Sequence, residues 1–130
     1  MGMIVLDTNT LIDFYELRFA DGTERQLKNI FASRQYCISI VTRMEIRSGI
    51  EKSSSPSALE AILQEAACID IWPGIEAETV RIRKTARLKL PDAIIAATAF
   101  YLGATLATSD RSGFSKVPGL DIWVPERRGG

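Results

Sequence analysis

Histidine is absent from the 130 residues of the chain. This absence excludes catalysis by a histidine general base, the Ser-His-Asp and Cys-His nucleophile systems, and zinc sites built on histidine. Any enzyme chemistry must therefore come from carboxylates, lysines, tyrosines, cysteines or a metal ion held by oxygen atoms.

Cysteine is scarce, and long apolar runs are missing. Cys37 and Cys68 both lie in short apolar segments, where buried free thiols are the ordinary state. The N-terminus has no basic stretch followed by an apolar one, and no apolar run approaches the roughly 20 residues that span a bilayer. We therefore expect a cytoplasmic protein with reduced cysteines and no membrane partner.

An excess of charge of either sign is also missing, since 16 basic residues balance 16 acidic ones. Net charge therefore gives no support for nucleic-acid binding. The distribution is uneven, because basic side chains crowd one segment: Arg81, Arg83, Lys84, Arg87 and Lys89. This segment could bind phosphates, or it could be the solvated face of a helix. The length suits one domain over residues 1–130.

Short apolar runs alternate with helical patterns along the chain. Strands are predicted over 3–6, 36–41, 68–72, 105–108 and 120–124, and helices from 8, around 27–31, from 42, around 59–63, over 75–88 and over 92–102. Thr42 and Glu45 have the spacing of a capping box for the third helix. Because such alternation is typical of parallel sheets covered on both faces, we predict a single three-layer α/β/α domain with a central, mostly parallel sheet.

Four acidic residues lie close to the ends of these strands. Asp7 directly follows the first strand, and Glu45 lies about one helical turn after the second. Asp92 begins the apolar helix that precedes the fourth strand, and Asp110 comes two residues after that strand. Ligands of open α/β folds gather at the carboxyl ends of the strands, so these acids are candidates for one site.

Each acid also has a purely structural interpretation. Asp7 could cap the helix that begins near residue 8, and Glu45 could be the second half of the capping box. Asp92 would complement the dipole of its helix, and Asp110 lies in a turn where Asp is common for backbone reasons. The combination is more informative than any member, because four neighbouring carboxylates repel one another unless a cation is present. Oxygen ligands alone suit Mg²⁺ or Mn²⁺.

The segments around these acids resemble the PIN domain family, and especially its VapC-type toxins. The matching motifs are Ile4-Val5-Leu6-Asp7-Thr8-Asn9-Thr10-Leu11-Ile12-Asp13, Thr42-Arg43-Met44-Glu45-Ile46, Leu90-Pro91-Asp92-Ala93-Ile94-Ile95-Ala96 and Leu106-Ala107-Thr108-Ser109-Asp110. They occur in the family's order and cover essentially the whole chain. Many relatives carry an Asp directly before the phenylalanine of the last motif, where this chain has Gly113, so Asp110 is the remaining candidate for a fourth acid.

The resemblance implies a Mg²⁺-dependent endoribonuclease, with Mn²⁺ as a substitute, that acts as the toxin of a toxin–antitoxin pair. It implies an RNA substrate, a homodimer and a small antitoxin whose C-terminal segment occupies or crosses the active site. Asp7, Glu45, Asp92 and Asp110 become the catalytic, metal-coordinating acids. Thr8, Asn9 and Thr108 become candidates for support of that site, although each could equally be an ordinary helix or strand residue. Arg111 could contact a phosphate or be a solvated turn residue.

Two other functions are compatible with the residues. The segment from Leu6 to Ile12 superficially resembles the start of a haloacid-dehalogenase-type phosphatase, but the second acid of that mechanism is replaced by Asn9, which cannot exchange a proton usefully. The chain could also be a non-catalytic module that binds RNA or a regulator and retains its acids for another purpose.

Overall fold

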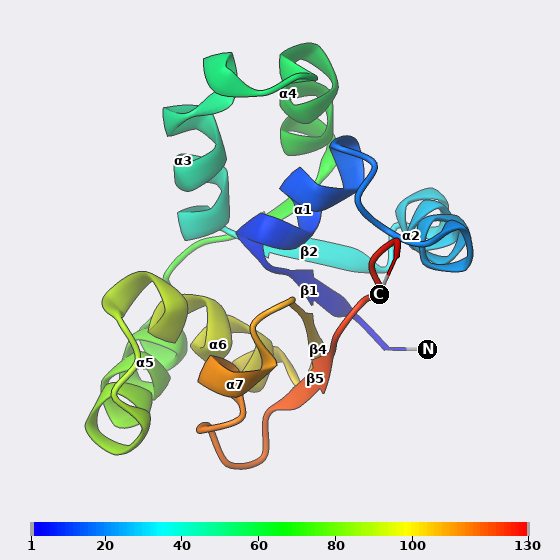
Figure 1. The fold of residues 1–130 in the computed structure, drawn as a ribbon. Helices are drawn as coiled ribbons and strands as arrows, with labels where there is room; N and C mark the ends of the chain where they lie inside the picture. Colours follow the sequence, from blue (N-terminus) through cyan, green and yellow to red (C-terminus); the bar gives the residue numbers. More distant parts are fainter. Residues whose placement is uncertain (1, 130) are drawn as a thin grey trace.

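Five parallel strands form one sheet in the order β3-β2-β1-β4-β5. The computed structural model describes residues 2–129. The strands are β1 (Ile4–Leu6), β2 (Tyr36–Ser39), β3 (Ala67–Ile69), β4 (Thr105–Ala107) and β5 (Asp121–Trp123). The helices are α1 (Thr8–Tyr15), α2 (Asp21–Ser33), α3 (Ile40–Ser48), the short 3-10 helix η1 (Ile50–Lys52), α4 (Pro56–Glu65), α5 (Pro73–Ala86), α6 (Leu90–Leu102) and α7 (Arg111–Phe114). Figure 1 shows this arrangement.

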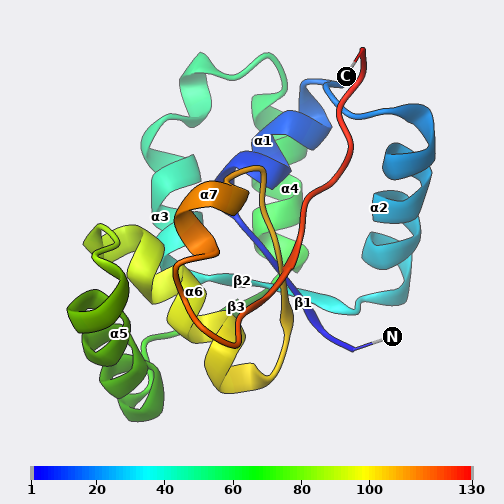
Figure 2. The same ribbon diagram turned by 60° about the horizontal axis from the view of Figure 1, so that its bottom comes forward.

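Helices cover both faces of the sheet, as Figures 1 and 2 show. Val5 and Leu106 point toward α5, α6 and α7, and they belong to one buried apolar cluster. Leu6 and Ile38 belong to a second cluster, together with side chains of α1, α2 and α4. The strands are therefore apolar on both faces, which confirms the three-layer α/β/α fold; the sheet is wholly parallel.

The strand order reverses between β1 and β4, because the chain moves outward from β1 to β3 and then returns to the other side of β1. Parallel sheets bind ligands at such a switch point, beyond the carboxyl ends of the strands. Asp7 follows β1 and Thr108 follows β4, and the N–H of Asp7 donates to the carbonyl of Ala107 at 3.0 Å. The fold thus brings the first and last acidic motifs side by side.

The boundary between β2 and α3 differs from the sequence prediction. The strand ends at Ser39, whose Oγ accepts a hydrogen bond from the N–H of Val41 at 3.1 Å and caps α3. Thr42 is not a cap but a fully buried residue inside the helix, so the predicted capping box with Glu45 is wrong. β-branched Ile40 and Val41 favour a strand by propensity, but the Ser39 cap and their packing place them in the first helical turn.

Two smaller boundaries also differ. The segment after Asp110, predicted as a turn, contains the one-turn helix α7. Trp72, predicted as the end of a strand, is the residue before α5, because Pro73 begins that helix. Helix α6 ends where predicted, at Gly103, whose φ of 63° is readily adopted by glycine.

The two cysteines lie on neighbouring strands but on opposite faces of the sheet. Cys37 is in register with Ala67, and Cys68 is in register with Ile38. Adjacent residues of a strand point to opposite faces, so the two thiols cannot bond without rearranging a strand, and both are free. Among residues 2–129, no helix combines the length and the apolar character needed to cross a membrane.

We expect Ser39→Ala to lower the free energy of unfolding by about 1 kcal/mol, because it removes the N-cap of α3. Urea denaturation followed by circular dichroism measures this change. Ser48→Ala is the matched control, since Ser48 is exposed and its hydroxyl only contacts the carbonyl of Met44 in its own helix; its effect should stay within about 0.5 kcal/mol. Equal effects of the two substitutions would contradict the assignment of the cap.

Candidate active site

Asp7 is a buried carboxylate at the switch point, with only 6% of its surface exposed. Its Oδ1 accepts the N–H of Thr8 at 2.8 Å, and its Oδ2 accepts the hydroxyl of Thr108 at 2.7 Å. Burial raises the pKa of Asp7 from 3.8 to about 6. The two hydrogen bonds oppose this rise, and the charges of Asp92 and Glu45 add to it. Asp7 therefore lies within electrostatic reach of both acids.

Glu45 is brought to Asp7 through the first residue of α1. The Thr8 hydroxyl donates to Oε1 of Glu45 at 2.6 Å and lies 3.1 Å from the hydroxyl of Thr42. The Thr8 hydroxyl thus links α1 to Glu45 of α3, which lies 37 positions later in the sequence. This contact explains why Thr42 is buried, and it gives Thr8 the orienting role that the sequence left open. The sequence predicts a cap at Thr42 because Thr42 and Glu45 have the spacing of a capping box.

Asp92 lies in the first turn of α6 and faces the other acids. Burial raises its pKa, and the charges of Glu45 and Asp110 raise it further. Lys89, the residue that precedes α6, lowers it. The cation of Lys89 is therefore near the acids. The sequence groups Lys89 with the basic segment that begins at Arg81. Lys89 also precedes Asp92 by three residues at the start of a helix, and this spacing brings two side chains close together.

Asp110 caps the one-turn helix α7, where the sequence predicts a turn. Its Oδ1 accepts the N–H of Gly113 at 3.0 Å and the hydroxyl of Ser112 at 3.2 Å. A Cβ added to Gly113 would lie 2.5 Å from Oδ2 of Asp110, so a larger residue there would displace this carboxylate. Gly113, where many relatives have an acid, therefore makes room for Asp110. The Asp110 N–H donates to the Thr108 hydroxyl at 3.0 Å, which links it to Asp7.

We refer to Asp7, Glu45, Asp92 and Asp110 as the acidic cluster. The charges of Glu45 and Asp92 raise the pKa of Asp7, and those of Glu45 and Asp110 raise the pKa of Asp92. Within residues 2–129, no three of these side chains converge closely enough to chelate a single ion by themselves. Mg²⁺ takes one or two protein carboxylates directly and keeps several waters, so the oxygen donors of these side chains are of the type that such an ion takes.

The other predicted supporting residues take different positions. Thr108 is fully buried and connects Asp7 with Asp110, as described above. Asn9 is exposed on α1, and in the part of the chain described here its side chain has no hydrogen bond. Arg111 is the exposed first residue of α7, and no ion pair within residues 2–129 involves it. Arg111 therefore has a charge available beside the acidic cluster, whereas Asn9 has no visible role.

Comparisons with known proteins agree with this geometry. The family model described as "PIN domain" matches residues 4–120. A curated relative, the tRNA(fMet)-specific endonuclease VapC of Salmonella typhimurium, is 31% identical over 94% of this chain and 97% of its own length.

Two solved structures have the same fold over nearly the whole chain. A toxin–antitoxin complex from Klebsiella pneumoniae contains a chain that is 31% identical, with a TM-score of 0.75 and coverage of 94% of this chain and 97% of that one. DNA-bound VapBC from Salmonella typhimurium contains one that is 27% identical, with a TM-score of 0.76 and coverage of 95% and 98%.

We expect the metal-free protein to lose stability as pH rises from about 4 to about 6. The folded state holds the Asp7 proton more tightly than the unfolded state, whose pKa is near 3.8, so folding is favoured while Asp7 is protonated. Asp7→Asn should therefore raise the free energy of unfolding at pH 7.5 by up to roughly 3 kcal/mol and flatten the pH dependence. Urea denaturation in chelator at pH 5 and pH 7.5 measures both.

Asp70→Asn is the matched control for this measurement. Asp70 also follows a strand, and its Oδ1 also accepts the next backbone N–H, at 2.8 Å, but its side chain is exposed. We expect its effect to stay within about 0.5 kcal/mol. A lower stability of Asp7→Asn than of the unmodified protein at pH 7.5 would contradict the unfavourable burial of the Asp7 charge.

Proposed function

The chain belongs to the PIN domain family, and from this premise we propose that it is a metal-dependent endoribonuclease, the toxin of a toxin–antitoxin pair. The observation that carries the proposal is the acidic cluster at the switch point, where the buried Asp7 is fixed by Thr8 and Thr108 and feels the charges of Asp92 and Glu45. Such a cluster of oxygen ligands suits Mg²⁺ or Mn²⁺.

The residues of the cluster have distinct roles in this proposal. Asp7 and Asp92 would hold the cation, and the Thr8 hydroxyl would orient Glu45 beside them. A bound divalent cation would neutralise charge on the scissile phosphate and make water a stronger nucleophile. Lys89 and Arg111 would offer positive charge to the RNA backbone, since both are exposed at the edge of the cluster. Hydrolysis by water would leave a 5′-phosphate and a 3′-hydroxyl.

A tRNA is the first substrate to test. The curated relative that is 31% identical is named for cleavage of tRNA(fMet), and the similarity extends over 94% of this chain. RNA is recognised largely by shape and by unstacked bases, so loops around the cluster would determine which tRNA is cut. We propose a structured RNA, with tRNA(fMet) as the leading candidate.

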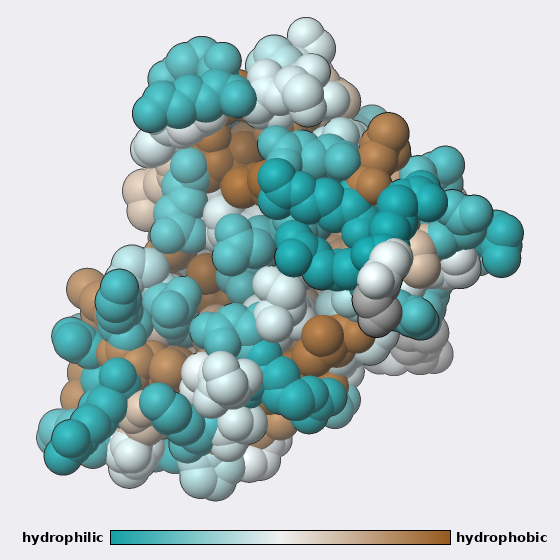
Figure 3. Space-filling model, viewed as in Figure 1, coloured by the Kyte–Doolittle hydropathy of each residue, from teal (hydrophilic) through white to brown (hydrophobic). Residues whose placement is uncertain are grey.

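An apolar groove beside the cluster supports the proposed antitoxin. It lies between α1, α3, η1 and α4 and is lined by Ile12, Glu16, Glu45, Ile46, Gly49, Ile50, Lys52, Ser53 and Leu59. Figure 3 shows apolar side chains in the hollow between α1 and α3–α4, surrounded by hydrophilic ones. Because Glu45 forms part of its wall, a peptide bound along this groove would reach the acidic cluster and block access to it. We also propose the homodimer, which rests on the family resemblance; light scattering of the purified protein tests it.

We expect Asp7→Asn and Asp92→Asn each to reduce RNA cleavage by about 100-fold or more, because each removes a charge that binds the cation. The assay uses end-labelled tRNA(fMet) and total RNA with Mg²⁺, with Mn²⁺ and with excess chelator, and it identifies the product ends. Asp70→Asn, the exposed acid after β3, should retain full activity.

Near-normal cleavage by both cluster variants would dismiss the assigned site. A 2′,3′-cyclic phosphate end would dismiss hydrolysis by water even if RNA were cut. Tight RNA binding by the folded protein, without any metal-dependent cleavage, would identify the non-catalytic module instead.

We expect Ile50→Glu to weaken inhibition by the antitoxin while leaving cleavage intact. Ile50 lines the apolar groove, and a buried charge there would be unpaired beside Glu16 and Glu45. The antitoxin concentration for half inhibition should rise by at least about 10-fold. Cleavage of tRNA titrated with the co-expressed product of the neighbouring gene measures it. Unchanged inhibition of Ile50→Glu would show that the antitoxin binds elsewhere.

A further inference from the structure

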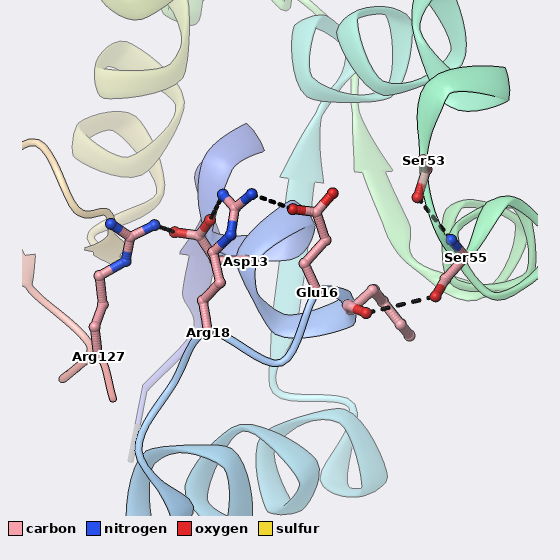
Figure 4. Close-up of polar contacts among 7 residues, drawn as sticks. Asp13, Glu16, Arg18, Ser53, Ser55 and Arg127 are labelled. Atoms are coloured by element: carbon pink, nitrogen blue, oxygen red, sulfur yellow. Dashed lines mark hydrogen bonds and ion pairs between the residues drawn. The ribbon is translucent and has the colours of Figure 1, made fainter. Parts of the chain in front are cut away.

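A second buried aspartate, Asp13, lies near the other end of α1, and it is held by two arginines. Its side chain is only 4% exposed. Oδ1 of Asp13 pairs with Nη1 of Arg18 at 2.9 Å, and Oδ2 pairs with Nη2 of Arg127 at 2.8 Å. Figure 4 shows the two guanidinium groups on either side of the carboxylate, with Glu16 pairing the far side of Arg18.

Arg127 comes from the C-terminal segment, which is bound along the loop between α1 and α2. The N–H of Ala20 donates to the carbonyl of Glu126 at 3.0 Å, and the N–H of Arg128 donates to the carbonyl of Arg18 at 2.9 Å. Phe19 and Arg127 form an antiparallel bridge between these hydrogen bonds. Figure 1 shows this segment leaving β5 and passing the end of α1 toward α2.

The same segment begins beside the acidic cluster. The carbonyl of Trp123, the last residue of β5, accepts the N–H of Thr108 at 3.0 Å. Thr108 in turn donates to Asp7, the N-cap of α1. The contacts therefore form a closed ring that runs from Asp7 through Thr108 and Trp123, along the C-terminal segment to Arg127, and back through Asp13 and α1.

Helix α1 carries the site at one end and Asp13 at the other. The six residues from Asp7 to Asp13 span roughly 9 Å, so a tilt of about 10° at the Asp13 end would move Asp7 by roughly 1.5 Å. Misplacement of about 1 Å in an active site can cost about 100-fold in rate. On the opposite side, the Ser55 hydroxyl lies 3.5 Å from the carbonyl of Tyr15 in Figure 4, which adds a weak polar contact to this end of α1.

We propose that Arg127 is a positioning residue for the active site: by pairing with the buried Asp13 it fixes the direction of α1, and through α1 it fixes the Asp7 carboxylate and the Thr8 hydroxyl. This inference rests on the proposed function, since it assigns Asp7 and Thr8 to the cleavage reaction. Arg127 touches neither substrate nor the acidic cluster, and its effect passes through the helix.

The test compares Arg127→Met with Arg128→Met in the full chain. Arg128 is the matched control, because it belongs to the same segment and is similarly exposed. Its side chain pairs with Asp21 and Glu24 on α2 and donates to the carbonyl of Leu17 in the loop after α1, whereas Arg127 pairs with Asp13 inside α1. Amide hydrogen exchange over residues 10–16 reports the stability of α1 directly, and tRNA cleavage with Mg²⁺ gives kcat and KM. Arg127→Lys restores a cation beside Asp13.

We expect Arg127→Met to speed exchange over residues 10–16 by about 10-fold and to lower kcat by about 10- to 100-fold with KM within about threefold. Arg127→Lys should recover most of both, and Arg128→Met should change neither by more than about twofold. A kcat of Arg127→Met within about twofold of the unmodified protein overturns the proposal, whatever happens to its melting temperature. If the unmodified protein cuts no RNA, the proposed function fails. Unchanged amide exchange over residues 10–16 in Arg127→Met separately refutes the claim that Arg127 stabilises α1.

Discussion

The burial of one carboxylate, that of Asp7, is the constraint on which the site depends. The side chain lies where the strand order reverses, with 6% of its surface exposed, and no arginine or lysine pairs with it among residues 2–129. Burial and the neighbouring acids disfavour its charge, and the Thr8 N–H and the Thr108 hydroxyl favour it. The resulting pKa of about 6 leaves Asp7 mostly ionised at neutral pH but at an energetic cost. The first residue of α1 and the residue that follows β4 are the ones that donate to this charge.

Structural and functional roles coincide in several residues. Asp7 caps α1, as its structural interpretation predicts, and Asp110, which the sequence places in a turn, caps α7. A carboxylate that caps a helix can also belong to the acidic cluster, because it has two oxygen atoms. The cap restricts the rotation of the side chain. Asp110 Oδ1 is fixed by Gly113 and Ser112, and this fixes the direction in which Oδ2 points. A cap thus pre-organises a carboxylate at no further cost in side-chain entropy.

The sequence was sufficient for much of the fold, and it identified four acids as candidates for one site. Apolar runs of three or four residues alternating with amphipathic helices predict a parallel sheet, because few other folds satisfy that pattern. The order of the acids relative to those strands then predicts their meeting at one edge. Local propensity failed at Ile40 and Val41, since β-branched residues are as compatible with a first helical turn after a Ser cap as with a strand.

Contacts between side chains that are far apart in the sequence could not be predicted from local patterns. The pairing of Thr8 with Glu45 spans 37 positions, and that of Asp13 with Arg127 spans 114. No periodicity links residues that far apart, and their meeting depends on the crossing angles of packed elements. Asp13 lay inside a recognised motif, but only the folded chain reveals that the C-terminal segment returns to neutralise it.

The two aspartates of α1 together argue for a cation at the cluster. Both carboxylates are buried; Asp7 is the N-cap of the eight-residue helix α1, and Asp13 lies within that helix. Asp13 is neutralised within the chain by Arg18 and Arg127, as a buried charge requires. Asp7 receives only neutral donors, and its nearest charged neighbours are acids that raise its pKa further. The fold places two guanidinium groups beside Asp13 within α1, and among residues 2–129 it pairs none with Asp7 at the start of that helix. A ligand that carries positive charge would balance Asp7, and oxygen donors suit the hard divalent cation of the proposed function.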